Sequence, residues 1–377
     1  MSTPVVLQYF SAMNEREASD LYLTVGFPPA LRIEGVLENI RKEPLTVDEI
    51  NEILASVLTN RQRREFETQL ELNTSLDVGP YGRFRVNVLR QRQNPALVLR
   101  RIISKIPTFD QLRLPRLLEK LSMEKRGLIL VTGMTGSGKS TTLASMINYR
   151  NQHEQGHIIT IEDPIEYFHE HNKCVVTQRE VGVDTGSYAI ALKNALRQRP
   201  DVILVGEVRD REVMDQALTA SETGHLCLAT LHTTNAYQSI ERVVNMFPED
   251  YQNQVRLNLS MNLRGIISQR LVPCSKGGMT VVIEVMLNQG LVRELIHKGD
   301  IGKIRDVMEQ NNQMGMCTFD QSLERAYREG LVTEETALSY ADQPGDLKIK
   351  LKQIALTDKG GKEVLREMDT SMLSISK

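Results

Sequence analysis

The residues best suited to chemistry lie in the stretch GMTGSGKSTT, which runs from Gly133 to Thr142. Its spacing matches G-x-x-x-x-G-K-[ST], a loop whose backbone N–H groups surround the phosphates of a nucleoside triphosphate. In such a loop Lys139 contacts the β- and γ-phosphates, and the Ser140 hydroxyl ligates Mg²⁺ at the start of a helix. The spacing predicts a nucleotide-binding set of Gly133, Thr135, Gly136, Ser137, Gly138, Lys139, Ser140 and Thr141.

Two glutamates are candidates for the catalytic step. Glu166 follows IEDPI, and Glu207 ends DVILVGE. A glutamate beside a bound triphosphate can accept a proton from the attacking water or orient that water. A single acid at a strand end is more often a solvated cap, but two that converge on one phosphate loop favour catalysis. Glu207 is also a candidate Mg²⁺ ligand, directly or through water.

Two histidines, His225 and His232, flank the segment LCLATL. A lone histidine is usually structural. His232, however, follows a predicted strand, where an imidazole can contact a γ-phosphate, and we take it as a catalytic candidate. For His225 the functional and structural interpretations both stay open.

Three arginines in the first hundred residues form a further hypothesis. Arg83 and Arg85 share one face of the predicted strand GRFRVNV, and Arg100 closes the apolar run ALVLR. An arginine supplied from elsewhere in the molecule accelerates other phosphoryl transfers by about 10³–10⁵. We expect one of the three to act in this way; the alternative is a solvated strand face.

The elements that must position these residues repeat one pattern. GLILVTG, HIITIEDP, DVILVGE and LCLATLHT each have the composition of a buried strand that ends in polar residues, and helical segments separate the last three. Such a pattern predicts a parallel sheet with helices on both faces, whose ligands bind outside the carboxyl ends of the strands. We therefore expect one edge of the sheet to hold Lys139 together with Glu162, Asp163, Glu166, Glu207 and His232.

The chain divides into four predicted regions: 1–105, a linker at 106–118, 119–345, and a charged tail at 346–377. In the first region, TVDEINEILASVL has a capping box of Thr46 and Glu49, which predicts a helix. From about residue 250 onward the pattern predicts mostly helix, including the segment PEDYQNQVRLNLSMNLRGIISQRLV. The tail is expected to be mobile or loosely docked.

Composition excludes several classes of protein. The chain has 377 residues, of which 41% are hydrophobic, as in an ordinary globular protein. Its formal net charge of −2 gives it no global attraction to nucleic acid or to an acidic membrane. Its start lacks the features of a signal peptide, and no apolar run approaches the ~18 residues of a membrane span. The four cysteines are isolated, without a C-x-x-C pair for zinc. We expect a cytoplasmic protein without zinc.

Five motifs in order resemble the secretion-type ATPases that power type IV pili, and most closely the PilT/PilU retraction group. They are SDLYLTVGFPPALRIEG, the phosphate loop, TIEDPIEY (the family's Asp box), DVILVGEVRD (its Walker B segment) and TGHLCLATLHT (its His box). The resemblance covers roughly residues 15–330.

This resemblance implies an α/β fold, in which a RecA-like P-loop ATPase domain with a helical C-terminal region follows a smaller α+β, PAS-like domain. It implies a homohexamer that hydrolyses ATP with Mg²⁺ to retract pili, docked on the cytoplasmic side of the inner membrane at the pilus base. The implied partners are an inner-membrane platform protein and, as a further candidate, a paralogous retraction ATPase, without nucleic acid. Glu166 corresponds to the general base and Glu207 to the Walker B acid.

Departures from the motif pattern favour the PilU branch over the PilT branch. Gln198 and Arg199 stand where the principal retraction motor usually has an acidic pair, and GLVRELIHKGD differs from that motor's AIRNLIREGK. The longer tail is also more typical of the PilU branch.

Three alternatives remain. A pilus-extension or type II secretion ATPase would typically carry paired zinc cysteines, which this chain lacks. A RecA-like nucleic-acid motor would show a basic groove with aromatic residues for stacking bases, whereas the dense basic run NRQRREF is explained as a solvated helix face. A non-catalytic ATP-binding subunit is disfavoured by the intact Lys139, Glu166 and Glu207.

Overall fold

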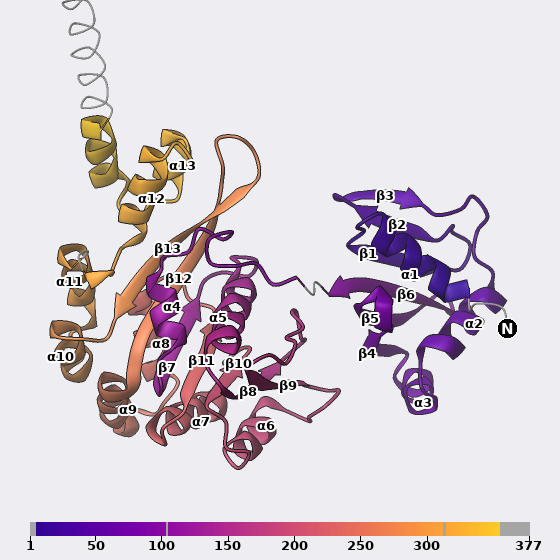
Figure 1. Ribbon diagram of the computed structural model, residues 1–377, viewed down its shortest axis with the longest axis horizontal. Coiled ribbons are helices and arrows are strands. Elements are labelled where there is room, and N and C mark those ends of the chain that lie inside the picture. The colour runs from indigo at the N-terminus through magenta and orange to yellow at the C-terminus, as the bar shows by residue number, and fades with distance from the viewer. Residues whose placement is uncertain (1–4, 103–104, 312–313, 355–377) are drawn as a thin grey trace, which may run out of the picture. The chain divides into compact units, whose positions relative to one another are not determined.

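The computed structural model describes residues 5–102, 105–311 and 314–354, and the chain forms two compact units (Figure 1). The first unit comprises Met1–Ile106 with Glu166–His169, and the second comprises Pro107–Ile165 with Glu170–Lys377. The short segment Glu166–His169 therefore belongs to the first unit, although the sequence places it between two strands of the second.

The first unit is built on an antiparallel sheet, whose strand order in the described residues is β3-β2-β1-β6-β5-β4. Its strands are β1 (Asp20–Thr24), β2 (Ala30–Ile33), β3 (Val36–Asn39), β4 (Glu71–Asp77), β5 (Arg83–Gln91) and β6 (Asn94–Ile102). The strand expected at GRFRVNV is confirmed as β5. Its alternation gives one buried face, because Phe84, Val86 and Val88 are all inaccessible to solvent.

Helices cover the buried face of this sheet. They are α1 (Val5–Glu15), α2 (Val47–Val57), α3 (Asn60–Gln69) and the 3₁₀ turn η1 (Gly79–Tyr81). The capping box predicted for α2 is confirmed, since Thr46 and Glu49 exchange both capping hydrogen bonds. Phe10 of α1 packs on Phe84 with 4.6 Å between ring centroids, which joins helix and sheet in one core.

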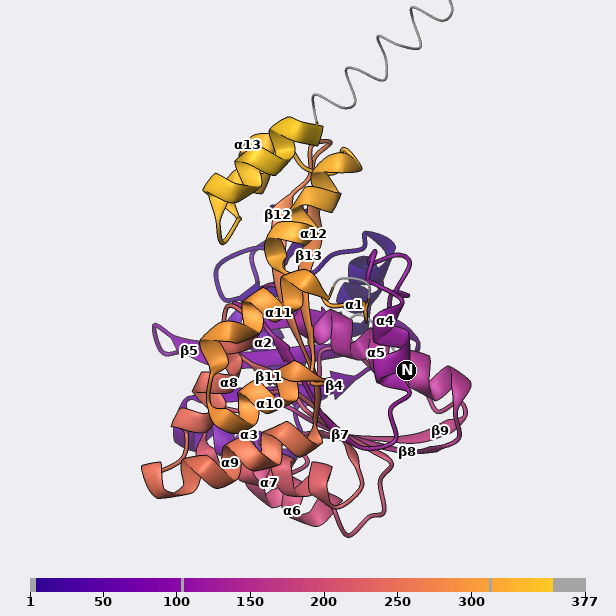
Figure 2. The same ribbon diagram turned by 90° about the vertical axis from the view of Figure 1, so that its left-hand side faces the viewer.

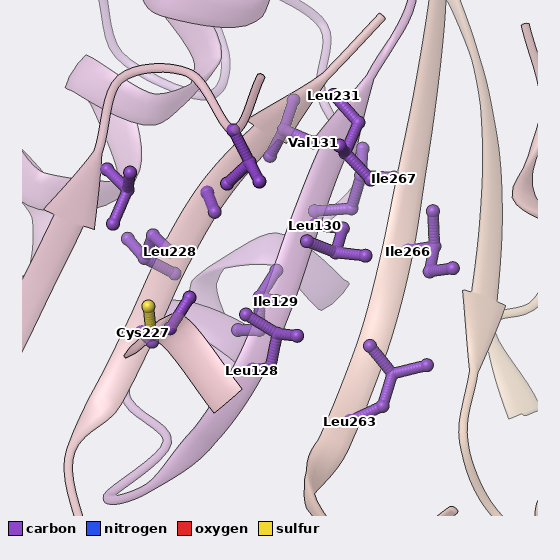
Figure 3. Packing of buried hydrophobic residues seen from close by; sticks show 14 of the residues in the cluster. Leu128, Ile129, Leu130, Val131, Cys227, Leu228, Leu231, Leu263, Ile266 and Ile267 are labelled. Carbon is purple, nitrogen blue, oxygen red and sulfur yellow. The ribbon is translucent and has the colours of Figure 1, made fainter. Parts of the chain in front are cut away.

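The second unit holds the mostly parallel sheet that the sequence predicts. In the described residues its order is β13-β12-β7-β11-β10-β8-β9, and only β13 runs antiparallel to its neighbour. The parallel strands are β7 (Gly127–Thr132), β8 (Gly156–Glu162), β9 (Cys174–Glu180), β10 (Val202–Val205), β11 (Leu226–Leu231) and β12 (Leu263–Pro273). Figure 3 shows the apolar side chains of β7 between those of β11 and β12.

Helices on both faces explain why these strands are apolar throughout. The chain crosses from β7 through α5 (Lys139–His153) to β8, and returns from β10 through α7 (Arg211–Glu222) to β11. The two crossovers move in opposite directions along the sheet, and right-handed connections then place α5 and α7 on opposite faces. The remaining helices between Pro107 and Asn262 are α4 (Leu117–Ser122), α6 (Tyr188–Ala195), α8 (Ala236–Asn245) and α9 (Glu249–Asn262).

The segment PEDYQNQVRLNLSMNLRGIISQRLV, expected to be helical throughout, is helical only as far as Asn262 and continues as a strand. After α9 the chain forms β12 and then β13 (Met279–Leu287), paired from Gly265↔Leu287 to Pro273↔Met279. A Cβ on Gly265 would lie 2.8 Å from the Met286 carbonyl, so this close backbone approach requires glycine. β9, which had not been anticipated, extends the other edge of the sheet.

Short helices complete the second unit (Figure 2). They are α10 (Leu291–Lys298), η2 (Ile301–Lys303), α11 (Ile304–Gln310), α12 (Phe319–Arg328) and α13 (Glu334–Ser339). Residues 344–354 are also helical, and Leu347 and Leu351 pack with Phe319 and Leu323 in a small core of their own. The first part of the tail, 346–354, thus packs against the second unit, although the whole tail was expected to be mobile or loosely docked. Its remainder, 355–377, lies outside the described residues. None of the described helices is long and apolar enough to cross a membrane.

Candidate nucleotide site

The phosphate loop joins the end of β7 to the start of α5, as its spacing predicts. Gly133 has a φ of +145°, and a Cβ there would lie 2.5 Å from both the Gln269 carbonyl and the Ser137 hydroxyl. Gly138 is left-handed, with φ +89°, in the residue before the helix begins. The backbone path of the loop therefore requires both glycines.

Lys139 begins α5 and is almost fully buried, with 8% of its surface exposed. Its Nζ donates to the carbonyls of Gly133 at 2.8 Å and Met134 at 2.9 Å, which holds the ammonium inside the loop. The Ser137 hydroxyl is buried and has no hydrogen-bond partner among the described residues. A phosphate oxygen would satisfy such a donor, so the loop fits the triphosphate predicted from its spacing.

Ser140 and Thr141 lie in the first turn of α5, where backbone N–H groups have no partner within a helix. Ser140 is exposed and Thr141 is partly exposed. The described residues contain no group of three or more His, Cys, Asp or Glu side chains that could hold a metal ion. Mg²⁺ at a triphosphate takes few protein ligands and completes its shell with phosphates and water, so one exposed hydroxyl suits it.

The carboxyl ends of the parallel strands bring together three of the predicted residues. Oε1 of Glu207, after β10, lies 3.1 Å from Nε2 of His232, after β11. Arg209 donates to the other oxygen of Glu207 at 2.7 Å and to Asp163, after β8, at 3.5 Å. Glu162 ends β8 and accepts a hydrogen bond from Thr160. Asp163, Arg209, Glu207 and His232 are therefore linked in one network rather than forming separate strand-end caps.

The electrostatics of this edge follow from these contacts. The hydrogen bond to Glu207 raises the pKa of Arg209 above its usual value. Burial, with Asp163 nearby, raises the pKa of Tyr188, so its phenol stays protonated. Arg209 was not among the predicted residues; the available signal was its position two residues after a strand-end acid, on the same loop.

Two predicted residues are not part of this cluster. His225 precedes β11, so it lies at the amino end of the strand that His232 follows, and its Nδ1 contacts Thr223 and the Ala220 carbonyl. Glu166 is exposed and belongs to the segment that packs with the first unit. Its role as general base stays a prediction.

The three candidate arginines share one face of the first unit's sheet. Arg85 lies directly opposite Arg100 in the β5–β6 register, and Arg83 is two residues from Arg85 on the same face. Arg100 donates to the buried Asp20 at 2.8 Å, and the Arg83 guanidinium lies 5.7 Å from the centre of the Phe168 ring. Arg100 therefore already has an ion-pair partner within its own unit.

Comparison with known proteins agrees with the site. The family described as "Type II/IV secretion system protein" matches residues 4–326. The type IV pilus ATPase PilU of Pseudomonas aeruginosa is 49% identical over 341 residues, which cover 90% of this chain and 89% of that protein. The type IV pilus retraction ATPase PilT of the same species is 42% identical over 335 residues, covering 89% and 97%.

A solved structure gives the same result for the fold. The crystal structure of the pilus retraction motor PilT with bound ADP matches with a TM-score of 0.85 at 44% identity, covering 91% of this chain and 98% of that one. The likeness to PilU and PilT spans nearly the whole chain, and the higher identity to PilU confirms the preference drawn from the motif departures.

Proposed function

The chain belongs to the type II/IV secretion system protein family, and from that premise we propose that it is a Mg²⁺-dependent ATPase that powers retraction of type IV pili. The phosphate loop supports the nucleotide part of this proposal, because Lys139 and the Ser137 hydroxyl fit a triphosphate. The observation that carries the retraction part is the likeness to PilU and PilT over about nine tenths of the chain.

The roles of the residues follow from their chemistry. Lys139 neutralises the β- and γ-phosphates, and Ser140 supplies a hydroxyl for Mg²⁺, which stabilises charge on the transferring phosphoryl group. Glu207 is held on both sides by His232 and Arg209, so it is oriented to bind Mg²⁺ through water or to position the attacking water. Glu166 takes the proton from that water in our assignment, and the product phosphate leaves from the γ position.

Assembly and location form a further part of the proposal. We propose a homohexamer on the cytoplasmic side of the inner membrane, acting on a platform protein at the pilus base. A paralogous retraction ATPase is a candidate partner. Support for this comes from the resemblance to the pilus retraction group.

Deletion of the gene followed by counting of surface pili tests the direction of the motor. We expect excess surface pili together with loss of twitching motility, because pili would extend without being withdrawn. Bald cells would instead support the extension alternative.

Lys139→Ala separates the enzyme from an accessory subunit. We expect ATPase activity near background with unchanged thermal unfolding, because the variant loses the ammonium that would contact the β- and γ-phosphates. A variant with wild-type turnover would exclude this loop as the active site. Wild-type protein without any ATPase activity would favour the accessory-subunit alternative.

A further inference from the structure

The segment Glu166–His169, which carries the proposed general base, is attached to the second unit at both ends. Ile165 before it and Glu170 after it belong to the second unit, whereas the four residues between them belong to the first. The Glu166 side chain is exposed, so its own packing does not hold it in place. Its position is therefore set through the backbone of the segment.

Glu180 holds the chain immediately before this segment. Its Oε2 accepts a hydrogen bond from the Ile165 N–H at 3.2 Å, and both residues are buried. Glu180 is the last residue of β9 and pairs in register with Glu162, the last residue of β8. Its carbonyl accepts from the N–H groups of residues 183–185, so the turn after β9 fixes the backbone of Glu180. The carboxylate is thus a fixed acceptor for the residue before Glu166.

Asn151 holds the chain where it returns after the segment. It lies on α5, the helix that Lys139 begins, and is 2% exposed. Its Nδ2 donates to the Glu170 carbonyl at 2.7 Å, and its Oδ1 accepts from the N–H groups of Cys174 at 3.0 Å and Asn172 at 3.3 Å. One buried amide therefore holds the returning chain through both its donor and its acceptor, on the helix that starts at the phosphate loop.

From these contacts we infer that Glu180 and Asn151 are positioning residues, which hold the two ends of the segment so that Glu166 can take the proton from the attacking water. The inference rests on the proposed base role of Glu166. A misplacement of about 1 Å in an active site can cost 10²-fold in rate, so anchors this close to the base should affect kcat. Neither residue belongs to the phosphate loop, and the affinity for ATP should not depend on them.

The test removes and then restores the acceptor for Ile165. In Glu180→Ala we expect kcat to fall roughly ten- to hundredfold while the affinity for ATP is unchanged. Hydrogen–deuterium exchange of the full chain should be faster at residues 165–170, because the Ile165 N–H loses its buried partner. Glu180→Gln keeps an oxygen for that N–H, so it should retain most of the wild-type kcat and the slow exchange.

Asn151→Ala tests the other end of the segment independently. It removes the contacts to Glu170, Asn172 and Cys174 together. We expect faster exchange at residues 170–174 and a lower kcat, again at unchanged affinity for ATP. Wild-type kcat in this variant, in spite of faster exchange, would overturn the positioning role of Asn151.

A double variant separates positioning from a general loss of stability. If Glu180 acts through Glu166, Glu180→Ala should lower kcat no further in a chain that already carries Glu166→Gln. An equal fall in both backgrounds, or unchanged exchange at residues 165–170, would overturn the inference. Normal kcat in Glu166→Gln alone would instead reject the base assignment, and the exchange would still show whether Glu180 holds the segment. The two failures are therefore distinguishable.

Asp201→Ala is the matched control. Asp201 also accepts a hydrogen bond from a backbone N–H, that of His157 at 2.8 Å, but at the amino end of β8 instead of beyond its carboxyl end. Its removal should lower the melting temperature through the lost hydrogen bond. Its kcat and its exchange at residues 165–170 should stay at the wild-type values.

Discussion

Glu207 shows how much a single residue depends on its neighbours. One of its oxygens faces His232 and the other accepts from Arg209, and the side chain is only 21% exposed. A carboxylate held in this way keeps a defined orientation. Glu166 has a contrasting environment, because it is exposed and belongs to the segment 166–169 of the first unit.

This contrast predicts different outcomes for two conservative variants. Glu166→Gln keeps the shape of the side chain but cannot take a proton, so we expect ATP binding to be retained and kcat to fall by about 10²–10⁴. Glu207→Gln also loses charge next to Arg209 and His232. We therefore expect it to weaken Mg²⁺-dependent ATP binding as well as turnover.

Steady-state ATPase assays, together with ATP titrations at low and high Mg²⁺, distinguish the two roles. Lys139→Ala provides the baseline of a disabled phosphate loop. Normal kcat in Glu166→Gln would remove that residue as the base and leave Glu207 as the better candidate.

At the scale of elements, the sequence predicted well where local patterns and tertiary packing agree. The strands β7, β8, β10 and β11 are apolar runs with polar ends, and buried parallel strands have that pattern whatever their neighbours are. Because these strands are parallel, their carboxyl ends lie at one edge of the sheet, which is why the edge with Glu207 and His232 was predictable.

The hairpin of β12 and β13 was not predictable in the same way. Its first strand follows α9 without a break at Asn262–Leu263, so the helical periodicity of α9 conceals the change. Pairing with β7, which lies about 135 residues earlier in the sequence, decides the outcome. The Gln269 carbonyl that faces Gly133 belongs to this hairpin, so its close approach to the phosphate loop could not be predicted from the sequence.

Glu284 on β13 gives a prediction about pH. The side chain is 4% exposed and accepts from the first N–H of α8, at Ala236, at 2.7 Å. Burial raises its pKa from 4.5 to about 7, although the hydrogen bond and the nearby Arg270 oppose the shift. Between about pH 4.5 and 7 the folded protein therefore keeps the Glu284 proton, whereas the unfolded chain has already released it. The free energy of unfolding consequently falls as the pH rises through that interval.

We expect Glu284→Gln, which keeps an acceptor for Ala236, to gain stability relative to the wild type as the pH rises. The difference in unfolding free energy should change by roughly 2–3 kcal/mol between pH 5 and pH 8. Urea unfolding of both proteins across this range measures it, and Glu324→Gln, on α12 and partly exposed, is the control. If the unfolding free energies of the wild type and Glu284→Gln change with pH in the same way, Glu284 does not titrate in this interval.

At the scale of the whole molecule, the two units contribute different parts of the proposed chemistry. The second unit holds the phosphate loop and the acidic edge, whereas the first concentrates arginines on one sheet face. Arg85 and Arg100 lie directly opposite each other, an arrangement that destabilises a sheet unless an anion compensates. Asp20 pairs with Arg100 and supplies part of that compensation.

We propose that this face supplies an arginine to the triphosphate, whose charge Lys139 and Mg²⁺ neutralise only in part. A guanidinium supplied by the first unit would couple hydrolysis to the movement of that unit, and in other phosphoryl transfers such a group is worth about 10³–10⁵ in rate. We therefore expect Arg83→Ala, Arg85→Ala or Arg100→Ala to lower kcat at least tenfold while leaving ATP affinity and oligomeric state largely intact. Arg100→Ala should also lower thermal stability, because it leaves the buried Asp20 without its ion pair.

Arg101→Ala is the matched control, since Arg101 adjoins Arg100 on the opposite face of β6 and pairs in register with the buried Phe84. Its kcat should stay near the wild-type value. For all four variants we would measure kcat, ATP affinity, melting temperature, and mass by light scattering. A catalytic arginine lowers kcat when it is removed. A residue that only stabilises the fold lowers the melting temperature and leaves the kcat of the folded protein unchanged. If all three variants on the arginine face turn over ATP at the wild-type rate, these residues serve only to balance Asp20 and to solvate the sheet, and coupling between the units must use other groups.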